Sequence, residues 1–212
     1  MSRLSRKEWM DALVIRHGAE LQEKFTQATV AVCGLGGLGS NIAIALARAG
    51  VGRLILIDFD CVDVTNLHRQ QYKADQIGLC KTEALRDNLL EISPFIRIEA
   101  VTAKITEDNL EELLKDATVV CEAFDHAEMK AMLVNGVLEK LPECYLVAAS
   151  GMAGMDTPNA IRTRKIMKHF YLCGDEVSDV SDKIGLVAPR VMLCAAHQAH
   201  TVLRILAGEY EL

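Results

Sequence analysis

The fold of this chain is decided by the stretch Thr29-Val30-Ala31-Val32-Cys33-Gly34-Leu35-Gly36-Gly37-Leu38-Gly39-Ser40. Its first five residues predict a buried strand, and residues 38–49 repeat apolar and small side chains at helical spacing before Gly50. Gly34 permits the tight turn between them, Gly36 lets a phosphate approach the backbone, and Gly39 lets the helix pack closely on the strand. The helix start, with its free N–H groups and dipole, favours an anion.

A second apolar strand, 54–57, ends at Asp58. An acid that binds ribose hydroxyls is expected roughly 20 residues beyond such a glycine loop, which is about where Asp58 lies. A glycine loop alone is weak evidence of function. Strand, loop, helix, strand and acid together predict a bound nucleotide.

Residues further along favour a triphosphate. The sequence contains no GxxxxGK[ST] motif, which excludes a P-loop as the ATP site. Arg69 and Lys81 place two cations near the helix start and suit a triphosphate better than NAD, and the carboxylate of Asp125 would reach it through Mg²⁺. Because the ends of parallel strands gather at one edge of a sheet, we expect Asp58, Arg69 and Asp125 to converge. The alternative reading of Arg69 and Lys81 as solvated surface pairs stays open.

At these residues the chain resembles the ThiF/MoeB family, the bacterial relatives of ubiquitin-activating enzymes. The shared motifs are GxGGLGS, DxD, NLxRQ, GxxK and a later aspartate, which begin here at Gly34, Asp58, Asn66, Gly78 and Asp125. The likeness runs from Arg16 to Gly208 and is greatest to short ThiF-type proteins of thiamine biosynthesis. It implies ATP-dependent adenylation of the C-terminal glycine carboxylate of a ubiquitin-like sulfur carrier, ThiS-like and ending in Gly-Gly, with release of pyrophosphate. It also implies a homodimer.

The resemblance assigns roles to single residues. Those that would bind the nucleotide are Gly34, Gly36, Gly37, Gly39, Asp58, Asp60, Asn66, Arg69, Gln70 and Lys81. Within this set Asp58 would hold the ribose, and Asn66, Arg69 and Lys81 would contact the phosphates. Asp125 would bind Mg²⁺ or orient the reacting groups. Arg16 matches an arginine that reaches across the family's dimers to the partner's ATP, and an ordinary surface arginine is the competing interpretation.

The seven cysteines lie at positions 33, 61, 80, 121, 144, 173 and 194, with no two closer than 19 residues. The CxxC pairs that hold structural zinc in many family members are therefore absent, which argues against tetracysteine zinc. A mixed site from His169 and Cys173, or from Cys194, His197 and His200, stays open beside simple packing. Some ThiF-type proteins link a cysteine covalently to the carrier. We predict that Cys173 is the candidate for this link and that it lies in an accessible, glycine-bearing loop. The alternative is that Cys173 is an inert thiol.

Length fits one domain, and half of the 212 residues are hydrophobic, which is ample for its core. The alternation of strands and helices over about 28–149 predicts an α/β fold with a Rossmann-like, doubly wound and mostly parallel sheet. We expect an N-terminal helical arm in 1–26, a nucleotide-binding core in 27–150, and a crossover loop, extra strands and a C-terminal helix in 151–212. No stretch reaches the 18 or so apolar residues of a membrane helix. The N-terminus lacks the apolar region of a signal peptide, and the unpaired cysteines fit the cytoplasm. A net charge of −6 gives no support for a nucleic-acid partner.

Individual elements follow from periodicity. After the first two strands we expect strands at 97–102, 117–121 and 144–149, and one or two strands within 161–172. Helices are expected at 81–92, 106–115, 127–141 and 188–207, the last closed by Gly208.

Three functions remain compatible with the sequence. The first is the carrier adenylyltransferase, or a superfamily relative such as a molybdopterin carrier adenylyltransferase or a tRNA-modifying dehydratase. The acidic composition weighs against the dehydratase. The second is an NAD-binding oxidoreductase, which leaves four residues unexplained: Asn66, Arg69, Lys81 and Asp125. The third is a nucleotide-binding scaffold without turnover.

Overall fold

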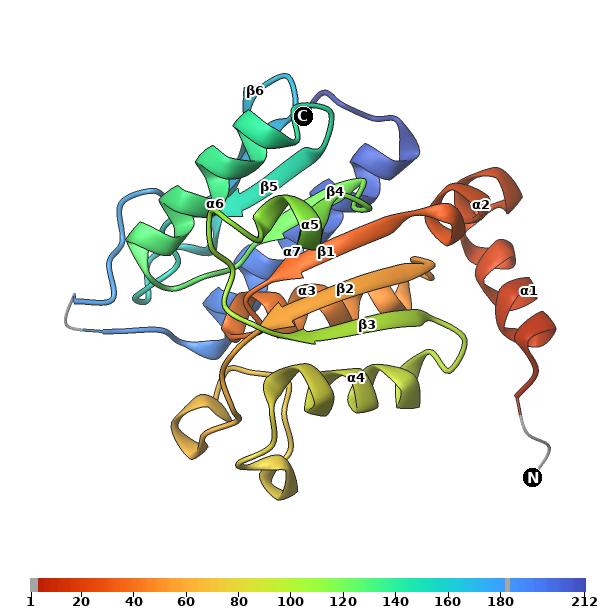
Figure 1. Ribbon diagram of the computed structural model, residues 1–212, viewed down its shortest axis with the longest axis horizontal. Helices are drawn as coiled ribbons and strands as arrows, with labels where there is room; N and C mark the ends of the chain where they lie inside the picture. Colours follow the sequence, from red (N-terminus) through yellow and green to blue (C-terminus); the bar gives the residue numbers. More distant parts are fainter. Residues whose placement is uncertain (1–3, 182–183) are drawn as a thin grey trace.

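A seven-stranded sheet forms the centre of the protein (Figure 1), of which a computed structural model describes residues 4–181 and 184–212. The order across the sheet is β3-β2-β1-β4-β5-β7-β6. The strands are β1 (Thr29–Cys33), β2 (Arg53–Asp58), β3 (Arg97–Thr102), β4 (Val119–Glu122), β5 (Tyr145–Ala149), β6 (Arg162–Met167) and β7 (Phe170–Gly174). Every neighbouring pair is parallel except β6 with β7. This confirms the predicted Rossmann-like sheet.

Helices cover both faces of the sheet (Figure 1). They are α1 (Arg6–His17), α2 (Ala19–Gln27), α3 (Gly37–Arg48), α4 (Lys81–Ile92), α5 (Leu110–Leu114), α6 (Ala127–Lys140) and α7 (Ala188–Ala207), with 3-10 turns at Val64–Asn66, Ala74–Gln76 and Pro158–Ala160. Helices α3, α4 and α7 share one hydrophobic core with the sheet, and α5 and α6 pack on the other face. Across the described residues, no helix combines the length and apolarity needed to cross a bilayer.

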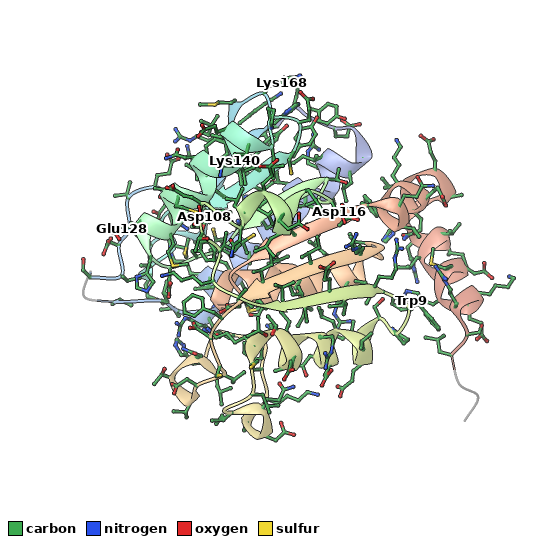
Figure 2. The ribbon with its side chains drawn as sticks, viewed as in Figure 1. Trp9, Asp108, Asp116, Glu128, Lys140 and Lys168 are labelled. Atoms are coloured by element: carbon green, nitrogen blue, oxygen red, sulfur yellow. The ribbon has the colours of Figure 1, made fainter. Side chains whose placement is uncertain are left out.

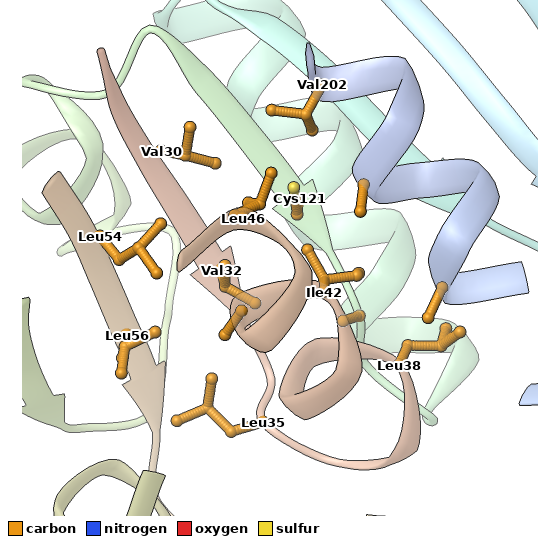
Figure 3. Close-up of a cluster of buried hydrophobic side chains, with 14 of the residues drawn as sticks. Val30, Val32, Leu35, Leu38, Ile42, Leu46, Leu54, Leu56, Cys121 and Val202 are labelled. Carbon is orange, nitrogen blue, oxygen red and sulfur yellow. The ribbon is translucent and has the colours of Figure 1, made fainter. Parts of the chain in front are cut away.

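The central strand β1 contributes to both cores, because successive side chains of a strand point to opposite faces. Val30 and Val32 belong to the core between the sheet and α3 and α7, which Figure 3 shows. Ala31 and Cys33 belong to the core under α5 and α6. A strand covered on both faces must be apolar at every position, which explains the unbroken apolar run before the glycine loop.

Most predicted boundaries agree with the structure, and two differences have local causes. The predicted N-terminal arm consists of two helices because the chain turns at Gly18, whose φ is +84°. The helix predicted at 106–115 begins only at Leu110. The Asn109 side chain accepts a hydrogen bond from the Thr106 N–H at 2.8 Å and holds the preceding residues outside the helix. The last helix ends as predicted, with Gly208 in the left-handed region.

The crossover segment, residues 150–187, contains the β6–β7 hairpin and two irregular passages that are hydrogen-bonded to each other. Ala153 N–H donates to the Ser178 hydroxyl at 3.0 Å, and Asp175 N–H donates to the Gly151 carbonyl at 2.9 Å. The segment returns to α7, which packs against α3 in the main core. This packing supports the proposal that residues 27–212 form one domain. Residues 1–3 of the predicted arm and 182–183 of the predicted crossover lie outside the described residues.

We predict that Gly39→Ala unfolds far more readily than the parent chain. A Cβ at Gly39 would lie 1.8 Å from the Gly34 carbonyl oxygen, so α3 would have to move off β1. Overpacking of this kind typically costs about 1–3 kcal/mol. Urea unfolding followed by circular dichroism measures the loss. Gly36→Ala is the matched control, because its Cβ would meet only the Gln70 amide at 3.7 Å. Equal stability of the two variants would contradict the prediction.

Candidate functional site

A cavity of about 520 Å³ opens at the carboxyl ends of the parallel strands. Strand β1 lies between β2 and β4, so the strand order reverses direction at β1. Open α/β sheets bind their ligands at such a reversal of strand order. The predicted residues that line the cavity are Gly34, Gly36, Gly37, Asp58, Asp60, Asn66, Arg69, Gln70, Lys81 and Asp125. The structure therefore brings together nearly all the predicted site residues. Gly39 does not line the cavity and instead lies in the contact between helix and strand.

The glycine loop presents backbone to the cavity. Gly34 has a φ of +89°, and its N–H donates to the Ile57 carbonyl at 2.9 Å, which joins the loop to β2. Gly36 caps α3 without a side-chain hydrogen bond to the helix. The first residues of α3, Gly37 and Leu38, line the cavity, where the free N–H groups of a helix start and the helix dipole favour an anion.

Asp58 holds the loop from the end of β2 and is only 7% exposed. Its carboxylate accepts hydrogen bonds from the N–H of Leu35 at 2.6 Å and of Asp60 at 2.8 Å. Burial raises the pKa of Asp58, while the charge of Lys81 and the two backbone hydrogen bonds act in the opposite direction. The sequence motif did not predict that Asp58 holds the glycine loop through the Leu35 N–H.

Lys81 provides a fixed cation at the cavity wall. Its ammonium lies 2.8 Å from the carboxylate of Asp60, and its side chain is almost fully buried whereas that of Asp60 is half exposed. The backbone N–H of Lys81 also donates to the Asp60 carbonyl at 3.0 Å. An anionic ligand would therefore meet a lysine that is already in position.

Arg69 and Gln70 carry buried polar atoms that have no hydrogen-bond partner in the described part of the chain, Nε and Oε1 respectively. One guanidinium nitrogen of Arg69 contacts the Thr65 carbonyl at 3.3 Å and the His68 ring at 2.7 Å. A buried polar atom without a partner costs about 1–3 kcal/mol, so these atoms fit a site built for a polar ligand.

Asp125 lies three residues beyond β4, with its side chain 85% exposed. It lines the cavity and lies 3.7 Å from the His126 ring. In the described residues, no three His, Cys, Asp or Glu side chains lie close enough to hold a metal by themselves. Mg²⁺ commonly binds through one or two carboxylates and substrate phosphates, and Asp125 fits that kind of site.

Two further charged residues were not predicted. Glu122, at the end of β4, is fully buried, and the Lys130 ammonium lies 2.8 and 2.9 Å from its two oxygens. Burial raises the pKa of Glu122 and Lys130 opposes this shift. Lys130 also donates to the Phe124 carbonyl at 3.0 Å and lines the cavity. The pair thus fixes the turn that carries Asp125 and adds a third lysine or arginine to the site.

The crossover segment forms another wall of the cavity and is anchored by a buried ion pair. Arg190 in α7 contacts the carboxylate of Asp175 at 2.5 Å and donates to the Ala153 carbonyl at 2.9 Å. Burial by itself would raise the pKa of Asp175. Hydrogen bonds from the Ser178 and Val177 backbone, from the Ser178 hydroxyl and from Arg190 outweigh it and lower that pKa to about 2.

The placement predicted for Cys173 is wrong. It lies in β7, paired with β5 and β6, and its side chain is 0% exposed instead of lying in an accessible loop. Burial raises the pKa of the Cys173 thiol to about 11, which makes the nucleophilic thiolate scarce at neutral pH. The short apolar run 170–173 pairs as a strand because the hairpin joins the edge of the main sheet.

Arg16 is exposed on α1 and is not among the residues that line the cavity. Figure 2 shows Trp9 of the same helix on the opposite side of the molecule from Glu128, which lies near the start of α6. One copy of the chain therefore does not bring Arg16 to its own cavity, and the predicted role in a dimer stays a prediction.

The mixed metal sites considered from sequence are not assembled among the described residues. His169 Nδ1 lies 2.9 Å from the Pro142 carbonyl, and His197 Nδ1 lies 2.9 Å from the Thr163 hydroxyl. Cys194 is buried in the main core. These side chains have packing and hydrogen-bonding partners of their own.

Comparison with known proteins gives consistent matches. Residues 10–212 match the ThiF family. The molybdopterin-synthase adenylyltransferase of Haemophilus influenzae is 38% identical over 190 residues, 87% of this chain and 76% of that protein. The sulfur carrier protein ThiS adenylyltransferase of Bacillus subtilis is 29% identical over 199 residues, 91% of this chain and 58% of that protein. This chain spans from 19% to 76% of the length of such curated relatives.

The fold also matches a solved structure over its whole length. A crystal structure of the Escherichia coli tRNA N6-threonylcarbamoyladenosine dehydratase in complex with ATP has a TM-score of 0.86. It is 23% identical, and the match covers 98% of each chain. At this identity the comparison shows that the two proteins share a fold.

We predict that the Asp175–Arg190 pair makes stability depend on acid pH. Because the folded pKa of Asp175, about 2, is below its ordinary value near 4, its contribution is complete above about pH 4 and is lost as the pH falls toward 2. Asp175→Asn leaves Arg190 uncompensated and should cost about 3–5 kcal/mol at neutral pH. Denaturant unfolding at several pH values should show that the difference in unfolding free energy between Asp175→Asn and the parent chain becomes smaller below pH 4.

The exposed Asp108 provides the matched control for this experiment. Asp108→Asn should have the same free energy of unfolding as the parent chain at every pH. A gap between Asp175→Asn and the parent chain that stays constant from pH 6 down to pH 2 would contradict the assignment.

Proposed function

The chain belongs to the ThiF family, and on this premise we propose that it is an ATP-dependent adenylyltransferase acting on a ubiquitin-like sulfur carrier protein. The main observation behind the proposal is that the glycine loop, Asp58, Arg69 and Lys81 line one cavity at the N-terminal end of α3. Curated relatives are adenylyltransferases for molybdopterin synthase and for ThiS, which supports the same reaction class here.

The reaction joins the carrier's C-terminal carboxylate to AMP. A carboxylate oxygen attacks the α-phosphorus of ATP, an acyl–phosphate bond forms, the bond between the α- and β-phosphates breaks, and pyrophosphate leaves. The carboxylate is already ionised at neutral pH, so the step needs no general base. It needs alignment of the two substrates and positive charge where negative charge develops.

The residues of the cavity fit these two requirements. The N–H groups at the start of α3 and the side chains of Arg69, Lys81 and Asn66 would hold the phosphates, with Lys130 as a further cation. Asp58 would accept hydrogen bonds from the ribose. When bound, Mg²⁺ would neutralise phosphate charge, held by Asp125 and phosphate oxygens. The unpartnered Nε of Arg69 would gain the acceptor that it lacks.

The crossover segment supports a protein substrate. Met152, Ala153, Val180 and Leu186 add apolar wall to the polar cavity. Exposed apolar side chains continue on this segment outside it, among them Met155 and Val177. A flexible Gly-Gly tail has no side chain that would clash with this wall. The rest of the carrier would then lie over the exposed apolar residues.

We further propose a ThiS-like carrier in thiamine thiazole biosynthesis, because the Bacillus subtilis relative acts on ThiS and aligns with 91% of this chain. A molybdopterin carrier is the direct competitor, since that relative has the higher identity. A tRNA dehydratase is a second candidate function, because the Escherichia coli dehydratase matches the fold over its whole length. The net charge of −6 disfavours RNA.

ATP–pyrophosphate exchange tests the proposal. Exchange that requires a purified ThiS-like protein ending in Gly-Gly supports it. If exchange is faster with a molybdopterin carrier or with a threonylcarbamoylated tRNA, the chain has the corresponding function instead. Binding of NAD in preference to ATP overturns the proposal.

We predict that Arg69→Ala and Asp125→Ala each lower carrier-dependent exchange by about 100-fold or more while the fold stays intact. Each removes a charge that acts on the phosphates, and losing one such group costs about 10²–10³ in rate. Circular dichroism and the melting temperature check the fold. Arg86→Ala at a half-buried position and Asp108→Ala at an exposed one, both outside the cavity, are the matched controls. Full activity of either cavity variant would show that the site assignment is wrong.

We also predict that Arg16 acts across a homodimer. Arg16→Ala and Arg69→Ala should each be inactive, but a refolded equimolar mixture should recover about a quarter of the parent activity. Half of its dimers pair the two variants, and each such dimer retains one intact site. Exchange assays on the separate and mixed variants provide the measurement. No recovery on mixing would contradict action across the dimer, and full activity of Arg16→Ala by itself would place Arg16 outside the reaction.

A further inference from the structure

Cys61 and Cys80 face each other across a short antiparallel bridge outside the main sheet. Two backbone hydrogen bonds, of 2.8 and 3.0 Å, flank the pair, each running from the residue after one cysteine to the residue before the other. This pattern defines a non-hydrogen-bonded antiparallel pair. In such pairs the Cα atoms approach to about 4.5 Å, and the two side chains project on the same side.

That spacing suits a disulfide. Cα atoms joined by a disulfide are usually about 4.4–6.8 Å apart, so the two cysteines can be bridged without a large backbone movement. Desolvation, and after it the neighbouring Cys61 thiol, raises the pKa of Cys80. Cys61 is exposed and Cys80 is half-buried, whereas four of the other cysteines, Cys33, Cys121, Cys173 and Cys194, are buried.

The pair is directly connected to the nucleotide cavity. Asp60 precedes Cys61 and Lys81 follows Cys80, and both line the cavity. Because side chains alternate along an extended backbone, the cysteines point to the side opposite to Asp60 and Lys81. A reagent can therefore reach the thiols from solvent without entering the cavity.

We propose that Cys61 and Cys80 form a dithiol–disulfide site that exchanges with small-molecule disulfides such as oxidised glutathione. The thiolate of Cys61 attacks the glutathione disulfide, a mixed disulfide forms, and one glutathione thiolate leaves. The thiolate of Cys80 then attacks the Cys61 sulfur and releases the second glutathione. Two electrons pass from the protein to glutathione disulfide, and the two thiol protons end on the two glutathione molecules. Exposed disulfides of this kind are readily reduced again.

Closure of the disulfide also affects the cavity, a consequence that rests on the proposed function. In the reduced protein the Lys81 ammonium lies 2.8 Å from the Asp60 carboxylate, which competes with bound phosphates for its charge. A disulfide ties together the two backbone segments that carry these residues. It thereby keeps the Asp60 carboxylate in competition with the phosphates for Lys81. Oxidation should weaken ATP binding, and by thermodynamic reciprocity ATP should oppose oxidation.

The first experiment tests the site itself and requires no nucleotide. The full-length reduced chain is incubated with oxidised glutathione at neutral pH, alkylated and digested, and its peptides are analysed by mass spectrometry. We expect one internal disulfide that joins Cys61 to Cys80 and disappears with dithiothreitol. Cys61→Ser should abolish it. Cys144→Ser, which removes another partly exposed thiol, should not. A persistent glutathione adduct without ring closure, or unchanged free thiols, would overturn the proposal.

The second experiment tests the coupling to the cavity. Isothermal titration calorimetry should show that ATP binds the oxidised chain about fivefold more weakly than the reduced chain. Cys61→Ser should bind ATP equally under both conditions. Equal affinity of the two parent forms would overturn the coupling. If neither form binds ATP, the proposed function fails, whereas the mapped disulfide stands.

Discussion

The close approach of α3 to β1 is the constraint on which the rest of the structure depends. Gly39 lies so near the Gly34 carbonyl that no side chain fits between them, and this contact directs the first turn of the helix at the strand ends. The loop between the two glycines is then held from both sides. Asp58 accepts the Leu35 N–H at 2.6 Å, and the Tyr72 hydroxyl donates to the Leu35 carbonyl at 2.8 Å. An anion site made of backbone N–H groups is useful only if the loop keeps its shape, and these contacts maintain it.

Charge around the cavity is arranged before any ligand arrives. Lys81 is held by Asp60, and Lys130 by the buried carboxylate of Glu122. Such pairs are poor sources of stability, because desolvation of two charges offsets most of their attraction. Their value lies in position. A cation that is already fixed at the wall of a cavity needs little reorganisation when negative charge develops on a bound ligand, and preorganised electrostatics has its largest effect in such a place.

Local sequence predicted the features that local sequence determines. The strand–glycine–helix unit, Asp58 and the NLxRQ and GxxK motifs are short patterns whose geometry is set by residues close in the chain, and all contribute to one cavity. The Lys130–Glu122 pair could not be predicted, because it depends on the angle at which α6 leaves β4. The prediction for Cys173 was wrong for a related reason. The neighbouring Gly174 suggested a loop, but pairing with β5, which is distant in the sequence, makes Cys173 part of a strand.

The crossover segment shows how distant residues complete a local motif. Arg190 donates to the carbonyls of Ala153, Asp156 and Thr157 and to the carboxylate of Asp175. Its guanidinium thus joins both passages of the segment to α7, which itself packs on α3. The glycine loop and the crossover wall of the cavity are therefore attached to the same pair of helices. Val191 of α7 also lines the cavity, so a helix without a recognisable motif helps to shape the site.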